Sequence, residues 1–145
     1  MLRVLTLITL LLAGGVTAQA EEALKATLYK NPQCGCCEGY ADYLRQNGFE
    51  VDVKPTNDLT QISRKAGVPE NFQGCHTMFI DGYVVDGHVP VNTVRKLLSE
   101  RPDIAGVTLP GMPLGSPGMG GQKTGSFEVY SITKEGKAPT VYATE

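Results

Sequence analysis

The sequence predicts an α/β domain with a mixed sheet flanked by helices. Residues 49–54 alternate apolar and polar side chains, which is the period of a half-buried strand. Residues 77–85 are typical of a hairpin, because Asp81-Gly82 between two apolar runs favours a type I′ turn. Segments with helical spacing of apolar residues separate these strands, and this alternation is typical of the α/β class.

The other elements follow in chain order. Residues 24–29 form a short strand, which Asn31-Pro32 ends. A helix is expected over residues 36–47, because apolar side chains recur there at helical spacing and a glycine follows. A second helix is expected over residues 58–66 and a third over residues 91–100. The order of these elements matches a thioredoxin-like arrangement.

The composition changes after Pro102. Residues 102–125 are rich in glycine and proline, from which we expect neither a helix nor a central strand. Strand character returns in residues 127–132 and in residues 140–142. The sequence contains no internal repeat.

The first twenty residues have the order of a secretory signal peptide. Arg3 precedes an apolar run, and small residues lead to Ala20. Glycine and polar residues interrupt the run before it reaches the roughly 18 residues that a membrane span needs. We therefore expect cleavage after Ala20 and an exported protein. The predicted division is a signal peptide over residues 1–20, a thioredoxin-like metal-binding domain over residues 21–102 and an extension over residues 103–145.

Composition limits the class of partner. The formal net charge at pH 7 is −2, and no basic stretch indicates nucleic-acid binding. Hydrophobic residues make up 41% of the chain, which supports a single globular fold with a core. Because no feature indicates an obligate oligomer, we expect a monomer.

Three of the four cysteines lie in Cys34-Gly35-Cys36-Cys37. Cysteines this close cannot join distant parts of a fold, and closing so short a ring removes little chain entropy. The segment lies between a predicted strand and a predicted helix, where the helix N-terminus favours thiolates. Cys34 and Cys37 form a C-x-x-C redox pair, and Cys36 adds a third sulfur that suits a thiolate-bridged metal site.

Cys75 and His76 directly precede the first strand of the hairpin. In a thioredoxin-like arrangement this junction faces the cysteine segment, so both residues are candidate metal ligands. His88, just past the hairpin, is another candidate. The alternatives are that Cys75 is a buried apolar side chain or a disulfide partner, and that the histidines only form hydrogen bonds.

Two methionines distinguish between metals. Met112 and Met119 lie in the Gly/Pro-rich segment, where few apolar neighbours need a methionine to fill a gap. Thioethers with thiolates are soft donors that select Cu(I), whereas zinc prefers thiolate, imidazole or carboxylate. We therefore expect copper. The alternative is a flexible linker whose methionines have no ligand role.

The assembled residues resemble the CopG-like periplasmic copper-resistance proteins of Gram-negative bacteria. The resemblance depends on YKNPQCGCCEGYADYLRQNGFEV, GVPENFQGCHTMFIDGYVVDGHVP and LPGMPLGSPGMGG. It implies a periplasmic protein that interconverts Cu(I) and Cu(II) during copper detoxification, with copper-export components as partners. It also implies a multinuclear copper cluster bridged by four cysteines, with further ligands from the histidines and the extension: Cys34, Cys36, Cys37, Cys75, His76 or His88, and Met112 or Met119.

Three hypotheses of function remain open. The first is a copper oxidoreductase that uses the thiolates to hold the metal. The second is a Cu(I) metallochaperone or storage protein with the same ligands and no redox turnover. The third is a metal-free thiol-disulfide oxidoreductase in which Cys34 attacks and Cys37 resolves.

Overall fold

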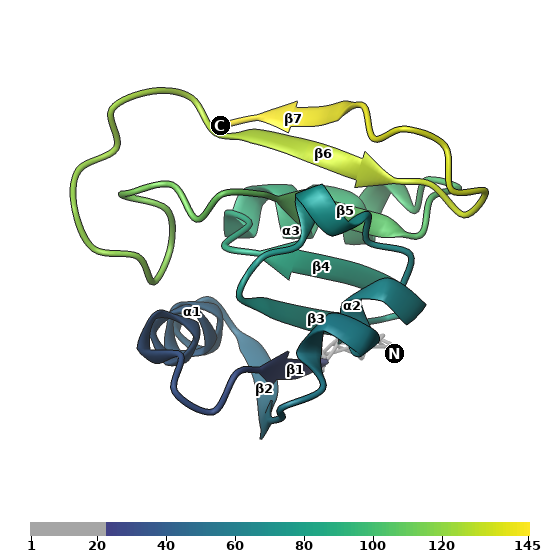
Figure 1. The fold of residues 1–145 in the computed structure, drawn as a ribbon. Helices are drawn as coiled ribbons and strands as arrows, with labels where there is room; N and C mark the ends of the chain where they lie inside the picture. Colours follow the sequence, from purple (N-terminus) through teal and green to yellow (C-terminus); the bar gives the residue numbers. More distant parts are fainter. Residues whose placement is uncertain (1–22) are drawn as a thin grey trace, which may run out of the picture.

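The computed structural model describes residues 23–145 (Figure 1). The predicted signal peptide, residues 1–20, lies outside the described residues. Within them, the elements confirm the predicted mixed α/β class, and most boundaries agree with the sequence patterns to within one or two residues.

One seven-stranded mixed sheet forms the centre of the molecule (Figure 1). In spatial order the strands are β2 (Phe49–Pro55), β1 (Leu24–Lys30), β3 (His76–Ile80), β4 (Tyr83–Gly87), β5 (Gly106–Leu109), β6 (Glu128–Ile132) and β7 (Val141–Thr144). The strand pairs β1/β2 and β4/β5 are parallel, and the other neighbouring pairs are antiparallel. The first four strands in this order are compatible with the thioredoxin-like arrangement.

Helices cover both faces of this sheet. On one face α1 (Gly35–Gln46) and α3 (Val91–Glu100) contribute to the main apolar core. Near the other face lie α2 (Leu59–Lys65) and the 3-10 turn η1 (Glu70–Phe72), where a smaller apolar cluster forms. None of the helices within residues 23–145 has the length and apolar character that a membrane crossing requires.

The hairpin between β3 and β4 forms as predicted. Asp81 and Gly82 both have positive φ, 47° and 83°, which a type I′ turn requires. Along β4, Val84 belongs to the smaller cluster and Val85 to the main core, so successive side chains serve opposite faces of the sheet. The hairpin therefore runs through the middle of the fold.

The expectation that residues 102–125 contain no central strand is wrong. Strand β5 lies inside that segment, pairs with β4 on one side and β6 on the other, and is buried along its whole length. Its first residue is Gly106, where an added Cβ would lie 1.9 Å from the carbonyl oxygen of Val84. The glycine and proline content of the longer segment concealed a four-residue strand whose sequence is Gly-Val-Thr-Leu.

Candidate metal centre

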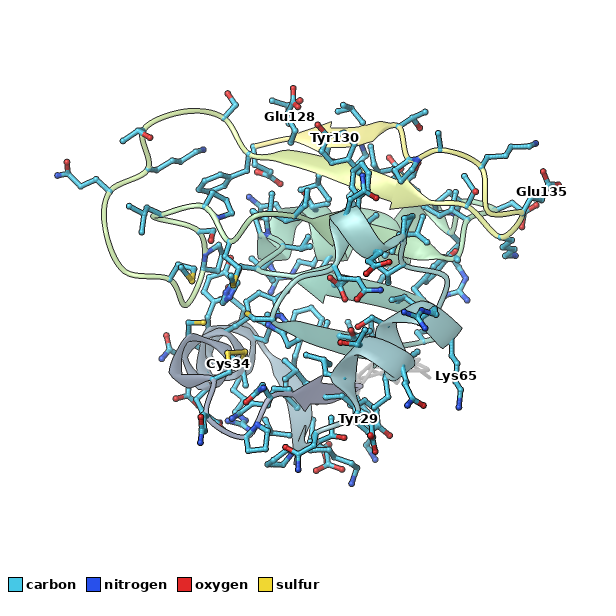
Figure 2. The ribbon with its side chains drawn as sticks, in the orientation of Figure 1. Tyr29, Cys34, Lys65, Glu128, Tyr130 and Glu135 are labelled. Atoms are coloured by element: carbon cyan, nitrogen blue, oxygen red, sulfur yellow. A yellow bond between two sulfur atoms is a disulfide. The ribbon has the colours of Figure 1, made fainter. Side chains whose placement is uncertain are left out.

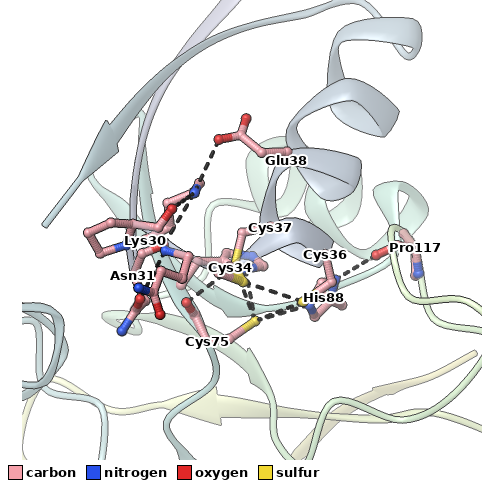
Figure 3. Close-up of a disulfide and its surroundings, with 12 residues drawn as sticks. Lys30, Asn31, Cys34, Cys36, Cys37, Glu38, Cys75, His88 and Pro117 are labelled. Atoms are coloured by element: carbon pink, nitrogen blue, oxygen red, sulfur yellow. Dashed lines mark hydrogen bonds and ion pairs between the residues drawn. A yellow bond between two sulfur atoms is a disulfide. The ribbon is translucent and has the colours of Figure 1, made fainter.

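The cysteine segment begins where β1 ends and continues into the first turn of α1. The Lys30 side chain is buried, and its Nζ donates to the carbonyls of Asn31 at 3.2 Å and Pro32 at 3.3 Å. The same Nζ lies 3.1 Å from the Glu38 carboxylate (Figure 3). The Cys34 amide donates to the Asn31 carbonyl. Lys30 thus stabilises the loop between β1 and α1, in which Cys34 is the N-cap residue of α1.

Four sulfur atoms from two distant segments meet at this helix end (Figures 2 and 3). Cys34 and Cys37 form a disulfide, while Cys36 and Cys75 are free thiols. The Sγ of Cys36 lies 3.4 Å from that of Cys34 and 3.8 Å from that of Cys75. The Sγ of Cys75 lies 3.4 Å from that of Cys37. The disulfide closes a short ring in one loop, so it joins the redox pair and does not join distant parts of the fold.

Two buried imidazoles lie beside Cys75, at the ends of neighbouring strands. The Sγ of Cys75 is 3.1 Å from His88 Nε2 and 3.6 Å from His76 Nδ1. The His76 ring stacks on Tyr40 with centroids 4.6 Å apart, and it meets the His88 ring edge-on at 4.9 Å. Packing against α1 thus holds His76 in place, and the fold brings both predicted histidines to the cysteines.

Burial keeps these groups uncharged. Desolvation, and secondly the neighbouring His88, lowers the pKa of His76 to about 3. Desolvation also lowers the pKa of His88, although the Pro117 carbonyl opposes this effect. Burial, with the nearby Cys36, raises the pKa of the Cys75 thiol to about 12. At neutral pH the metal-free site therefore holds neutral imidazoles beside a protonated thiol, whose proton a bound metal ion would displace.

The donor set fits a soft or borderline metal ion. One ligand atom from each of the four cysteines lies within 4.8 Å of all the others, and the same holds for Cys75, His76 and His88. Cys75 belongs to both groups. His76 Nε2 is buried without a hydrogen-bond partner among the described residues, which is rare unless the group has another role. Thiolate and imidazole donors together suit copper and zinc.

The Gly/Pro-rich segment reaches the site through its backbone. The carbonyl oxygen of Pro117 lies 2.7 Å from His88 Nδ1 (Figure 3). Met112 is 42% exposed and Met119 is half-buried. Within residues 23–145 the described contacts of the cysteine sulfurs are with other cysteines and the two histidines, so ligation by the methionines stays a prediction.

The sequence patterns missed three residues that support the site, namely Lys30, Asp86 and Pro117. Asp86 is buried and accepts hydrogen bonds from the Gly74 amide at 2.5 Å and the Thr77 hydroxyl at 2.7 Å. It thus holds the backbone just before Cys75. The position of Asp86 in an otherwise apolar strand could have been noticed in the sequence. Pro117 could not, because it contacts His88 through its backbone carbonyl, which every residue type has.

Comparison with known proteins places the chain among relatives. A family profile described as "Protein of unknown function, DUF411" matches residues 72–119. Two structures titled "Copper resistance protein copG", forms 2 and 1, are each 38% identical to this chain and superpose with TM-scores of 0.79 and 0.78. Each match covers 86% of this chain, and 99% and 98% of the respective relative. No functionally curated protein matches the chain.

Proposed function

Because this chain belongs to the CopG-like family of copper-resistance proteins, we propose that it binds copper at the junction of α1, β3 and β4. The observation that carries the proposal is the meeting of four sulfurs and two buried imidazoles from three separate segments. Thiolate and imidazole donors select copper over the hard cations that carboxylates bind. The proposed ligands are Cys34, Cys36, Cys37, Cys75, His76 and His88, with Met112 and Met119 as additional soft donors.

We place this activity in the periplasm, after removal of residues 1–20. A copper-resistance role in that compartment fits a chain that receives copper and passes it to export components. In this proposal residues 21–102 form the metal-binding domain, and residues 103–145 form an extension that closes over it. The protein acts as a monomer.

We further propose that the C-x-x-C pair supplies electrons. When reduced, Cys34 and Cys37 release two electrons and two protons as their sulfurs join in the disulfide. These two electrons convert two Cu(II) ions to two Cu(I) ions. Cys34 and Cys37 bind copper as thiolates only before this step, because sulfurs in a disulfide are no longer thiolate ligands. Cys36, Cys75 and the histidines then retain Cu(I), and an external dithiol reduces the disulfide again. This division of labour is supported by the disulfide lying 3.4 Å from each free thiol.

The main competing function is metal-free thiol-disulfide exchange. The disulfide at the N-terminus of α1 favours it, since such pairs exchange with substrate thiols. It gives no role to Cys36, Cys75 or the histidines beside them. Copper storage without redox turnover uses the same ligands and differs only in leaving the C-x-x-C pair unoxidised.

An anaerobic titration of the reduced protein with Cu(II) tests these functions together. Electron paramagnetic resonance follows Cu(II), a thiol assay follows the cysteines, and gel filtration measures retained copper. The wild type should reduce about two Cu(II) per chain, as a two-electron disulfide requires, and retain the product. Cys36→Ser/Cys75→Ser should reduce copper but not retain it. Its matched control, Cys34→Ser/Cys37→Ser, lacks the electron-donating pair and should reduce fewer Cu(II) ions than the wild type, while still retaining copper supplied as Cu(I).

The outcomes separate the hypotheses. Retention of copper supplied as Cu(I), with added Cu(II) left unreduced and the thiol count unchanged, would indicate Cu(I) storage without redox turnover. No retained copper in the wild type would overturn copper binding. Rapid reduction of insulin disulfides by the metal-free protein would favour thiol-disulfide exchange.

A further inference from the structure

One backbone atom of the extension determines which nitrogen of His88 is available as a ligand. The Pro117 carbonyl, 2.7 Å from Nδ1, can only accept a hydrogen bond, so Nδ1 carries the ring hydrogen. The opposite nitrogen, Nε2, keeps its lone pair and lies 3.1 Å from Cys75 Sγ. Figure 3 shows His88 between Cys75 and Pro117. The ring is therefore oriented from one side and presented to the cluster on the other.

The turn that carries this carbonyl is docked directly on α1. Gly118 has a φ of 80°, and an added Cβ would lie 2.4 Å from the Tyr40 nitrogen and 2.8 Å from the Cys36 carbonyl oxygen. An added Cβ at Gly39, on the helix, would lie 3.1 Å from the Gly118 carbonyl oxygen. Backbone meets backbone at this contact, so a side chain at position 118 would push the turn away from α1.

The turn is also held by its own hydrogen bonds. Ser116 is buried, and its hydroxyl donates to the Pro113 carbonyl at 2.7 Å. The Ser116 amide donates to the same carbonyl at 3.1 Å, and the Met119 amide donates to the Ser116 carbonyl at 2.9 Å. These bonds place the Pro117 carbonyl before any metal binds.

We infer that the turn of residues 116–118 positions His88 as an Nε2 ligand, and that the extension serves the metal centre through this carbonyl. Pro117 and Gly118 are positioning residues, because they act on the centre only through His88. The ligand role of His88 rests on the proposed function, whereas its tautomer can be measured without metal. Loss of the group that orients a ligating histidine typically costs about 10–100-fold in metal affinity.

The test compares Gly118→Ala with Gly120→Ala. Gly120 lies in the same segment, and an added Cβ there would meet nothing within 4 Å. Imidazole nitrogen NMR of the metal-free protein reports the tautomer, and competition with a chromogenic chelator reports Cu(I) affinity. We expect Gly118→Ala to lose the fixed Nδ1–H tautomer and to bind Cu(I) about 10–100-fold more weakly. Gly120→Ala should match the wild type in both measurements.

A double-mutant cycle separates positioning from a general loss of structure. In a His88→Gln background, Gly118→Ala should cause no further loss of Cu(I) affinity, because the residue through which it acts is absent. Pro117→Ala keeps the carbonyl, so it should keep the tautomer. An equal loss from Gly118→Ala in both backgrounds would overturn the inference.

The wild type alone also decides the matter, even if Gly118→Ala does not fold. A hydrogen on Nε2 of His88 in the metal-free protein would overturn the inference and leave the proposed function intact. A wild type that binds no Cu(I) would instead overturn the proposed function, and with it the ligand role of His88.

Discussion

At the scale of single residues, Asp86 connects the metal centre to the other side of the sheet. Its carboxylate accepts a hydrogen bond from the Thr77 hydroxyl, which lies 2.6 Å from the Ser63 hydroxyl. Ser63 in turn donates to the Leu59 carbonyl. When Asp86 is ionised, the hydroxyl protons of Thr77 and Ser63 are the two that serve three contacts: Thr77 with Asp86, Thr77 with Ser63, and Ser63 with the Leu59 carbonyl. Burial raises the pKa of Asp86 although the hydrogen bonds that its carboxylate accepts favour the ionised form.

The raised pKa of Asp86 predicts how stability depends on pH in the metal-free protein. Desolvation, opposed by the bonds from Thr77 and Gly74, raises this pKa from 3.8 to about 6. Between pH 4 and pH 6 the folded state thus holds a proton that the unfolded state releases. The free energy of unfolding should fall as pH rises through this window, by about 3 kcal/mol from this group.

Asp86→Asn isolates the effect, because asparagine does not ionise and keeps an acceptor for the Gly74 amide. The wild type should lose about 3 kcal/mol of stability relative to this variant between pH 4 and pH 7, measured by urea unfolding. His76, whose lowered pKa destabilises the fold as pH falls from 6.5 towards 3, is present in both proteins and cancels. A stability difference that does not change with pH would contradict the prediction.

At the scale of elements, β5 is the strand on which the C-terminal part of the sheet depends. It links β4 to β6, and the Val84 amide donates to the Ala105 carbonyl just before β5 begins. The close approach of β5 to β4 requires that position 106 carry no side chain. An added Cβ there would overlap the Val84 carbonyl oxygen.

Gly106→Ala is therefore expected to lower the free energy of unfolding by about 1–3 kcal/mol or more, since relief requires the backbone of a buried strand to move. Urea unfolding of the metal-free protein measures the change. Gly125→Ala is the matched control, because an added Cβ there meets nothing within 4 Å. Equal stability of the two variants would show that β5 tolerates a side chain at this position.

At the scale of the whole molecule, the sheet continues across residue 102. Strands β5 to β7 all lie beyond this residue, yet they extend the same sheet that carries the cysteines and histidines. Val107 and Val129 of this part belong to the main apolar core together with residues of α1 and β1. The division at residue 102 stays a proposal about organisation, and the core runs through it.

Truncation tests whether the two parts also fold separately. A chain of residues 21–102 would expose the edge of β4 and uncover apolar side chains now buried against β5 and β6. We expect it to lack a cooperative unfolding transition, since an exposed central strand invites aggregation. The control is a chain that ends at residue 132, which loses the edge strand β7 with its flanking residues and keeps β5 and β6. Cooperative unfolding of the 21–102 chain would make residue 102 a true domain boundary.

Most elements were predictable because their signals are local. The alternation of apolar and polar residues predicted β2, and the Asp81-Gly82 turn predicted the hairpin. The helical spacing of apolar residues predicted the range Val91–Glu100 of α3. Residues that act through long-range contacts were not predictable. Composition concealed β5, and nothing in the chain indicated that the carbonyl of Pro117 would meet His88.

The sequence by itself determined the chemistry of this protein: four cysteines and two histidines spaced so that a strand end, a helix start and a hairpin must carry them. Residue types and local periodicity are properties of short segments, so they can be seen without a fold. Only the tertiary structure decided that a disulfide joins Cys34 and Cys37, that Cys75 lies in both groups of candidate ligands and that the Pro117 carbonyl meets His88. Those features depend on distances between segments far apart in the chain, and packing sets such distances.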